Sequence, residues 1–154
     1  MTPLKERLRN DLTSAMKDRD KERSSTIRMV LSAITEAEVA GSVAVQLSEA
    51  QVLDVVIREA KKHREAEQAF AAAGRAELAD KEQAEAAVLA DYLPRQLDLE
   101  EIATIVTEAI VRTNASELGM PAMGKVMAAV TSQTKGRADG GLVAAEVRRQ
   151  LQRG

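Results

Sequence analysis

The chain has 154 residues, 45% of them hydrophobic and 30% charged, and its formal net charge is −2. This composition is typical of a soluble globular protein with one domain or two small ones, and it excludes a disordered chain. The absence of cysteine excludes disulfide frameworks, Cys-ligated zinc, iron–sulfur clusters and thiol nucleophiles. His63 is the only histidine, which excludes a metal site built from several histidines of one chain.

The balance of residue types favours helices. Alanine, the strongest helix former, occurs 27 times, whereas Phe70 and Tyr92 are the only aromatic residues. Cores rich in β-structure depend on aromatic and β-branched side chains. Apolar residues recur at spacings of three and four along almost the whole chain, which predicts an all-α protein.

The first half of the chain predicts four helices in succession. Leu4, Leu8 and Leu12 begin the apolar stripe of the first helix. The second helix starts near Asp20. We expect it to end at Gly41, because glycine readily takes the left-handed conformation of a helix cap.

The third and fourth helices are predicted to be long and antiparallel. A capping box at residues 48–51 starts the third helix, and Gly74 ends it. The fourth runs from about Arg75 to Leu93, because the proline that follows disfavours helical geometry in the residue before it. Residues 1–94 are therefore predicted to form an N-terminal helical domain.

A domain boundary is predicted at residues 94–97, so that residues 97–154 form a second domain. Asp98 and Glu101 make another capping box. Three short helices follow and are expected to form a small bundle with a modest core. Their apolar stripes contain Leu99, Ile102, Ile105, Val106, Ala109 and Ile110, then Met123, Val126, Met127 and Val130, and finally Leu142, Val143, Val147 and Leu151.

Positive charge is concentrated near the C-terminus, where residues 125–154 carry six basic and two acidic side chains. Such an excess is the usual footprint of binding to a phosphate backbone, since counterion release supplies much of the affinity. A solvated surface with cations near a helix C-terminus is the alternative. The basic residues are Lys125, Lys135, Arg137, Arg148, Arg149 and Arg153. A second basic group, Arg58, Lys61, Lys62 and Arg64, either forms a functional surface or pairs with acidic residues on its own helix.

No catalytic residue, metal ligand or cofactor site is predicted. His63 lies in a helical pattern, and there is no Gly-x-Ser-x-Gly motif to supply a nucleophile. The loop at residues 135–141 lacks the Walker spacing, so its glycines serve either as a backbone anion site or as a turn. Met123 and Met127, with Met120, are interpreted as core filling rather than as an adaptable partner surface.

The segment that begins the sequence carries charges where a signal peptide needs an apolar stretch. No uncharged apolar run reaches the length of a membrane span. These features predict a cytoplasmic protein without a membrane partner.

Three motifs in this helical context resemble the YqeY family of GatB/YqeY-domain proteins. They are Asp91-Tyr-Leu-Pro-Arg-Gln-Leu97, Met123-Gly-Lys-Val-Met127 and Lys135-Gly-Arg-Ala-Asp139. The C-terminal part of this family is similar to the tail domain of the B subunit of the glutamine-dependent aminoacyl-tRNA amidotransferase, which contacts tRNA. The resemblance implies an RNA-facing surface at Lys125, Lys135, Gly136 and Arg137, to which the charge pattern adds Arg148 and Arg149.

Three functions remain open at this point. The first is a protein that is not catalytic by itself and binds tRNA, or a tRNA-linked enzyme such as the amidotransferase or an aminoacyl-tRNA synthetase. The second is a component of a glutamine-dependent amidotransferase, a carbon–nitrogen ligase with glutamine as amido-N-donor. The chain lacks that enzyme's kinase-like cradle domain and its amidase Ser-Ser-Lys machinery, and a shared fold does not transfer chemistry. The third is a helical adaptor that binds another protein.

Overall fold

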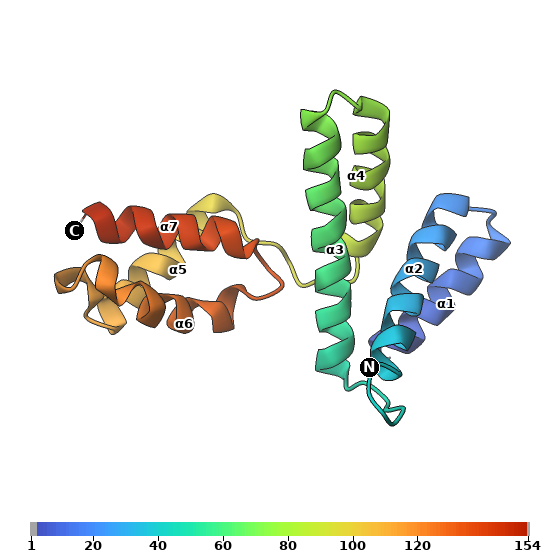
Figure 1. The fold of residues 1–154 in the computed structure, drawn as a ribbon, viewed down its shortest axis with the longest axis horizontal. Helices are drawn as coiled ribbons and strands as arrows, with labels where there is room; N and C mark the ends of the chain where they lie inside the picture. The colour runs from blue at the N-terminus through green and yellow to red at the C-terminus, as the bar shows by residue number, and fades with distance from the viewer. Residues whose placement is uncertain (1–2, 154) are drawn as a thin grey trace. The chain divides into compact units, whose positions relative to one another are not determined.

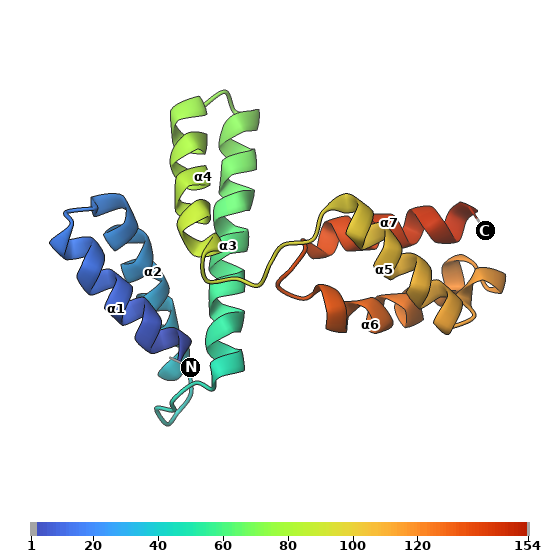
Figure 2. The same ribbon diagram turned by 180° about the vertical axis from the view of Figure 1, so that it is seen from behind.

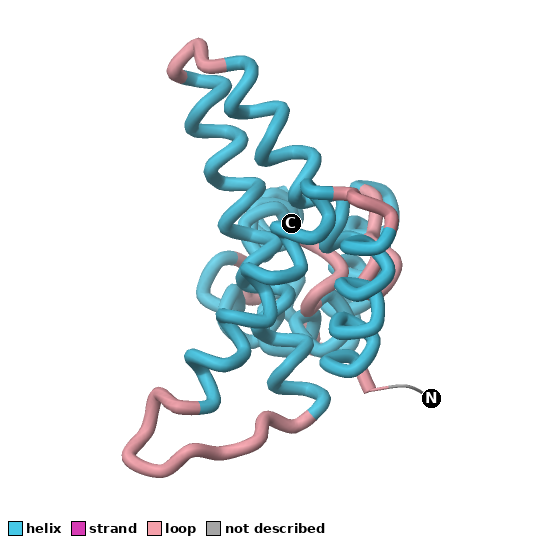
Figure 3. The backbone as a smooth tube through the Cα atoms, turned by 90° about the vertical axis from the view of Figure 1, so that its right-hand side faces the viewer, coloured by secondary structure: helices cyan, strands magenta, loops and turns pink. Residues whose placement is uncertain are grey.

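The structure is a computed structural model that describes residues 3–153. These residues form seven α-helices and two short 3₁₀ segments, with no strand among them, which confirms the all-α prediction (Figure 1). The tube drawing accordingly contains only helices and loops (Figure 3). The helices are α1 Leu4–Lys17, α2 Lys21–Glu38, α3 Glu49–Ala72, α4 Ala76–Ala90, α5 Leu99–Arg112, α6 Met123–Thr134 and α7 Gly140–Arg153, and the 3₁₀ segments are Ala115–Glu117 and Met120–Ala122.

The chain divides into two compact units, Met1–Leu93 (unit 1) and Pro94–Gly154 (unit 2). Each unit has a hydrophobic core of its own. In unit 1, the apolar stripes of α1, α2, α3 and α4 meet in a core whose largest fully buried side chains are Leu8, Ile27, Val30, Ile34, Val56 and Leu89. In unit 2, helices α5, α6 and α7 pack against one another around Ile102, Val106, Val126, Val130, Val143 and Val147.

Helices α3 and α4 form an antiparallel hairpin, which is seen from both sides in Figures 1 and 2. The Ser48 hydroxyl accepts from the Gln51 amide and the Gln51 side chain accepts from the Ser48 amide, so the predicted capping box starts α3. Gly74 joins the two helices with a φ of +73°, a left-handed conformation that glycine adopts without steric cost. The predicted end of the third helix is therefore confirmed.

Two predicted helix ends are wrong. Helix α2 ends at Glu38, before Gly41, and Gly41 does not have a positive φ. The chain leaves the helix there because the Glu38 carbonyl accepts from the Val45 amide and its carboxylate accepts from Lys5. Helix α4 ends at Ala90 rather than Leu93, because the chain turns to bring Tyr92 into the core of unit 1.

The capping box that starts α5 is confirmed, since Asp98 and Glu101 each accept from the other's backbone amide. The predicted burial of Leu99 and Leu142 is wrong, because both side chains are exposed. Each lies in the first turn of its helix, where the core-facing stripe has only begun. The buried stripes start with Ile102 in α5 and Val143 in α7.

Candidate nucleic-acid interface

Helices α6 and α7 run antiparallel within unit 2, joined by the loop that contains Lys135, Gly136 and Arg137 (Figure 1). This topology separates the six predicted RNA-binding residues into two groups. Those three residues lie at the loop end of the helix pair, whereas Lys125, Arg148 and Arg149 lie toward its other end. With a rise of 1.5 Å per residue, α6 separates Lys125 from Lys135 by about 15 Å.

The guanidinium of Arg137 makes hydrogen bonds within unit 2. Its Nε donates to the Arg95 carbonyl at 3.3 Å, and its Nη1 donates to the Gln133 carbonyl at 3.3 Å. The backbone carbonyl of Arg137 accepts from the Leu97 amide at 2.7 Å. Arg137 therefore fastens the segment before α5 to the end of α6, and this positioning role was not predicted from its charge.

Gly136 also has a structural task. Its φ of +76° lies in the left-handed region, which allows the tight turn after α6. Its carbonyl accepts from the Gln96 side-chain amide at 2.8 Å. Two of the three sequence motifs, at residues 91–97 and 135–139, thus meet through hydrogen bonds inside unit 2.

The cations of α6 and α7 differ in what they contact. Arg149 is paired with Glu146, one turn earlier on α7, and the hydrogen bond to this carboxylate raises the pKa of Arg149. Lys125 and Arg148 are exposed, and the salt bridges formed among residues 3–153 include neither of them. Lys125 and Arg148 are therefore the best placed of the six to meet a phosphate.

The loop at residues 135–141 leads into α7, and Asp139 caps the N-terminus of this helix. Asp139 Oδ1 accepts from the Gly141 amide at 2.9 Å at the N-terminus of α7. A carboxylate therefore already uses a backbone donor that an anion would need, and its negative charge opposes a phosphate. This geometry favours the turn over the anion site.

A groove of about 390 Å³ lies beside α5 in unit 2. Asp98, Glu100 and Glu101 line it together with Arg137 and apolar side chains. The hydrogen bond from Arg95, followed by that from the Asp98 backbone, lowers the pKa of Glu101 to about 2, so this carboxylate stays ionised at neutral pH. Because carboxylates repel a phosphate, the groove is excluded as a phosphate site. The exposed cations of α6 and α7 remain as candidates.

The remaining sequence candidates are explained by packing and pairing. Met123 and Met127 pack against the core of unit 2, as core filling predicts. Met120 is exposed, so the core-filling interpretation is wrong for this residue. In the second basic group, Lys61 pairs with Glu65 and Lys62 with Glu59, both on α3. These pairs favour the interpretation of that group as a solvated helix face.

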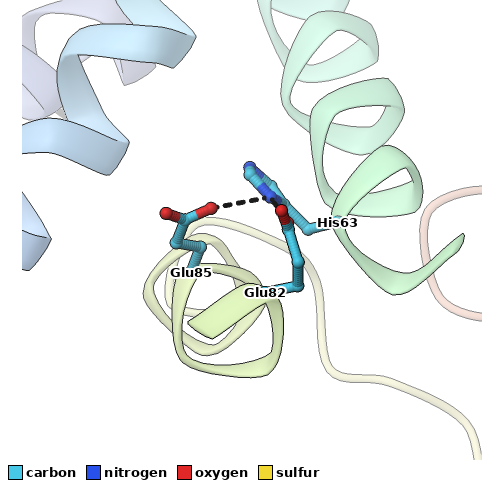
Figure 4. A group of neighbouring side chains, drawn as sticks. All are labelled: His63, Glu82 and Glu85. Carbon is cyan, nitrogen blue, oxygen red and sulfur yellow. Dashed lines mark hydrogen bonds and ion pairs between the residues drawn. The ribbon is translucent and has the colours of Figure 1, made fainter. Parts of the chain in front are cut away.

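Sequence reasoning missed one cluster of chemical groups, which lies between α3 and α4 in unit 1. His63 Nδ1 is 2.6 Å from Glu82 Oε2 and 3.1 Å from Glu85 Oε2 (Figure 4). Each of these three side chains offers one atom that could ligate a metal ion, and the three atoms lie within 4.8 Å of one another. His63 and Glu85 are buried, and Glu82 is partly exposed.

Replacing Arg137 with lysine separates the contacts of this residue from its charge. We expect Arg137→Lys to lower the free energy of unfolding of unit 2 by about 1 kcal/mol, because an ammonium cannot reach both carbonyls as the planar guanidinium does. Urea unfolding of the full chain measures this loss. Arg148→Lys is the control, with an expected change within about 0.5 kcal/mol. Equal stability of the two variants would contradict the positioning role.

The chain was also compared with known proteins. No curated protein matches it. No helix within residues 3–153 has both the length and the apolar character needed to cross a membrane. The family model described as Yqey-like protein matches residues 5–151, which is nearly the whole chain, and the chain therefore belongs to the YqeY family.

Proposed function

We propose that this protein binds tRNA through phosphate contacts made by α6 and α7 of unit 2, and that it is not catalytic by itself. The observation that carries the proposal is the excess of basic over acidic side chains in residues 125–154, six against two. The exposure of Lys125 and Arg148 supports it, since these side chains can reach a partner without breaking the fold.

The composition of unit 2 also favours a particular mode of RNA binding. Residues 94–154 contain no aromatic residue. Binding of single-stranded RNA depends on bases that stack on aromatic side chains, whereas folded RNA is recognised through its phosphates and its shape. A structured RNA such as tRNA therefore fits this surface better than a single strand does.

The family resemblance supports the choice of tRNA among structured RNAs, because the C-terminal part of the family is similar to a domain that contacts tRNA. An amidotransferase or an aminoacyl-tRNA synthetase is accordingly the enzyme partner we propose. In this proposal the protein contributes binding, and the amide-transfer chemistry belongs to the partner.

The double variant Lys125→Ala/Arg148→Ala tests the proposal. We expect it to bind tRNA roughly 30-fold more weakly at 0.1 M salt, because two phosphate contacts and their released counterions are lost. The slope of log affinity against log salt should become less steep by about 2 units. Both values come from tRNA titrations of the full-length protein at several salt concentrations.

The matched control is Lys61→Ala/Lys62→Ala, which removes two exposed lysines that pair with carboxylates on α3. We expect this variant to bind tRNA within about twofold of the unchanged protein. Binding that is insensitive to salt, or equally weakened in both double variants, would overturn the site. Failure of the unchanged protein to bind tRNA would overturn the function and favour the protein-binding adaptor.

A further inference from the structure

The cluster of His63, Glu82 and Glu85 is assembled from two helices of the same hairpin. Glu82 and Glu85 are three residues apart on α4, so their side chains lie on one face and point toward α3. His63 of α3 meets both carboxylates with the same ring nitrogen (Figure 4). The α3–α4 hairpin therefore places one nitrogen and two oxygen ligands at a single point.

The cluster places two carboxylate side chains against a single imidazole. His63 and Glu85 are only 8% and 6% exposed. Buried charge is costly unless it is paired.

A second observation concerns the other ring nitrogen of His63. Its Nε2 is buried and has no hydrogen-bond partner among the described residues. Nearly all buried polar atoms of proteins have a partner, so this orphaned nitrogen is unusual. The polar contacts of His63 are made by Nδ1, the ring nitrogen that faces both carboxylates.

We propose that His63, Glu82 and Glu85 bind a divalent transition-metal ion, with Zn²⁺ as the representative ion. A divalent cation in place of the imidazole proton gives a set with no net charge, since it balances both carboxylates. Imidazole combined with carboxylates is a donor set that suits zinc, manganese and iron, whereas calcium and magnesium prefer oxygen ligands alone.

The geometry of the cluster fits such an ion. Metal–ligand distances of about 2.0–2.2 Å in a tetrahedral site place neighbouring ligand atoms about 3.4 Å apart. The separation of 3.1 Å between His63 Nδ1 and Glu85 Oε2 is close to this value, and all three ligand atoms lie within 4.8 Å of one another. The 2.6 Å between His63 Nδ1 and Glu82 Oε2 is a hydrogen-bond length, so the Glu82 side chain has to move outward when an ion binds. Glu82 is partly exposed, which gives an ion a path from solvent and leaves room for a water as a fourth ligand.

The test uses the full-length protein after treatment with a chelator. Calorimetric titration with Zn²⁺ is expected to show one site per chain, and Co²⁺ bound at the same site should give a visible absorption band. His63→Ala and Glu85→Gln should each weaken binding about 10-fold or more, because each removes a ligand. Glu77→Gln, which changes an exposed carboxylate on α4, is the control and should bind as the unchanged protein does.

Circular dichroism verifies that each variant is folded, and Glu82→Gln, at the partly exposed position, serves if a buried variant unfolds. Zn²⁺ should also raise the thermal unfolding temperature of the unchanged protein but not that of a folded ligand variant. The absence of a stoichiometric site, or Zn²⁺ affinity that stays within twofold in His63→Ala and the glutamine variants, would overturn the proposal. No RNA is present in this experiment, so its outcome is independent of the tRNA proposal.

Discussion

Replacing Ile102 with alanine is expected to destabilise unit 2 by about 2–5 kcal/mol. Ile102 is 2% exposed and belongs to the core that α5, α6 and α7 share. Its truncation removes apolar contacts and leaves a cavity that the surrounding helices fill only in part. A unit of this size draws only about 3–5 kcal/mol from a single core, so the variant should be close to its unfolding midpoint at room temperature.

Limited digestion with trypsin measures this effect, since the enzyme cuts after the basic residues of α6 and α7 once they unfold. In Ile102→Ala these sites should be cleaved much faster than in the unchanged protein. Leu99→Ala is the matched control on the same helix, because Leu99 is 70% exposed and its truncation costs little. Equal resistance of the two variants would show that Ile102 is not a core anchor.

Unit 1 is expected to lose about 2–3 kcal/mol of stability between pH 10 and pH 12 through one side chain, Tyr92. Tyr92 is 4% exposed, its hydroxyl donates to Asp11 at 2.5 Å, and the Arg7 guanidinium lies 4.6 Å from its ring centre. Burial and then the Asp11 hydrogen bond raise the pKa of Tyr92 to about 12. Because the folded state holds this proton more tightly than the unfolded state, the stabilisation is complete below pH 10 and is lost as the pH rises through 12.

Urea unfolding at pH 9 and at pH 12 measures this loss. The phenylalanine variant, Tyr92→Phe, keeps the ring and lacks the proton, so its stability should fall less over the same interval. Lysine titration contributes equally to both proteins and cancels in the comparison. Tyr92 is the only tyrosine, so the absorbance of the phenolate follows its titration directly. An equal alkaline loss in the two proteins would contradict the assignment.

Helices could be predicted from the sequence because their signals are local. The capping boxes at Ser48 and Asp98 and the glycine turn at Gly74 each depend on residues within one helical turn. The end of α2 was misplaced because it depends on Lys5, which lies 33 residues from its partner Glu38. Tertiary contacts of this kind leave no periodic pattern in the sequence.

The candidate interface was predictable only as a local excess of charge. A sequence pattern does not distinguish Arg137, which binds backbone carbonyls, from Arg148, which is exposed. Nor does it show that Arg149 is paired with Glu146, although their spacing permits it. The contacts of each cation depend on the course of the backbone around it, and this is settled by the packing of the helices.

The cluster at His63 did leave a signal in the sequence. In an antiparallel hairpin, residues at equal distances from the turn lie opposite each other. His63 precedes Gly74 by eleven residues and Glu85 follows it by eleven, so reflection about the turn pairs the two. Applying this symmetry to the charged residues of both helices would have found the pair, and Glu82 follows from its position one turn before Glu85.

The two ends of the α3–α4 hairpin differ in how strongly they resist local unfolding. No residue from 64 to 78 is buried, and α4 begins without a side-chain cap. The tip therefore depends mainly on the helix propensity of its alanines, whereas the base is held by the core of unit 1. Opening the tip exposes little apolar surface, so it costs far less free energy than unfolding the unit. His63 and its two carboxylates lie at the boundary between these two parts. On one side the hairpin can fray, and on the other it unfolds only together with the core of unit 1.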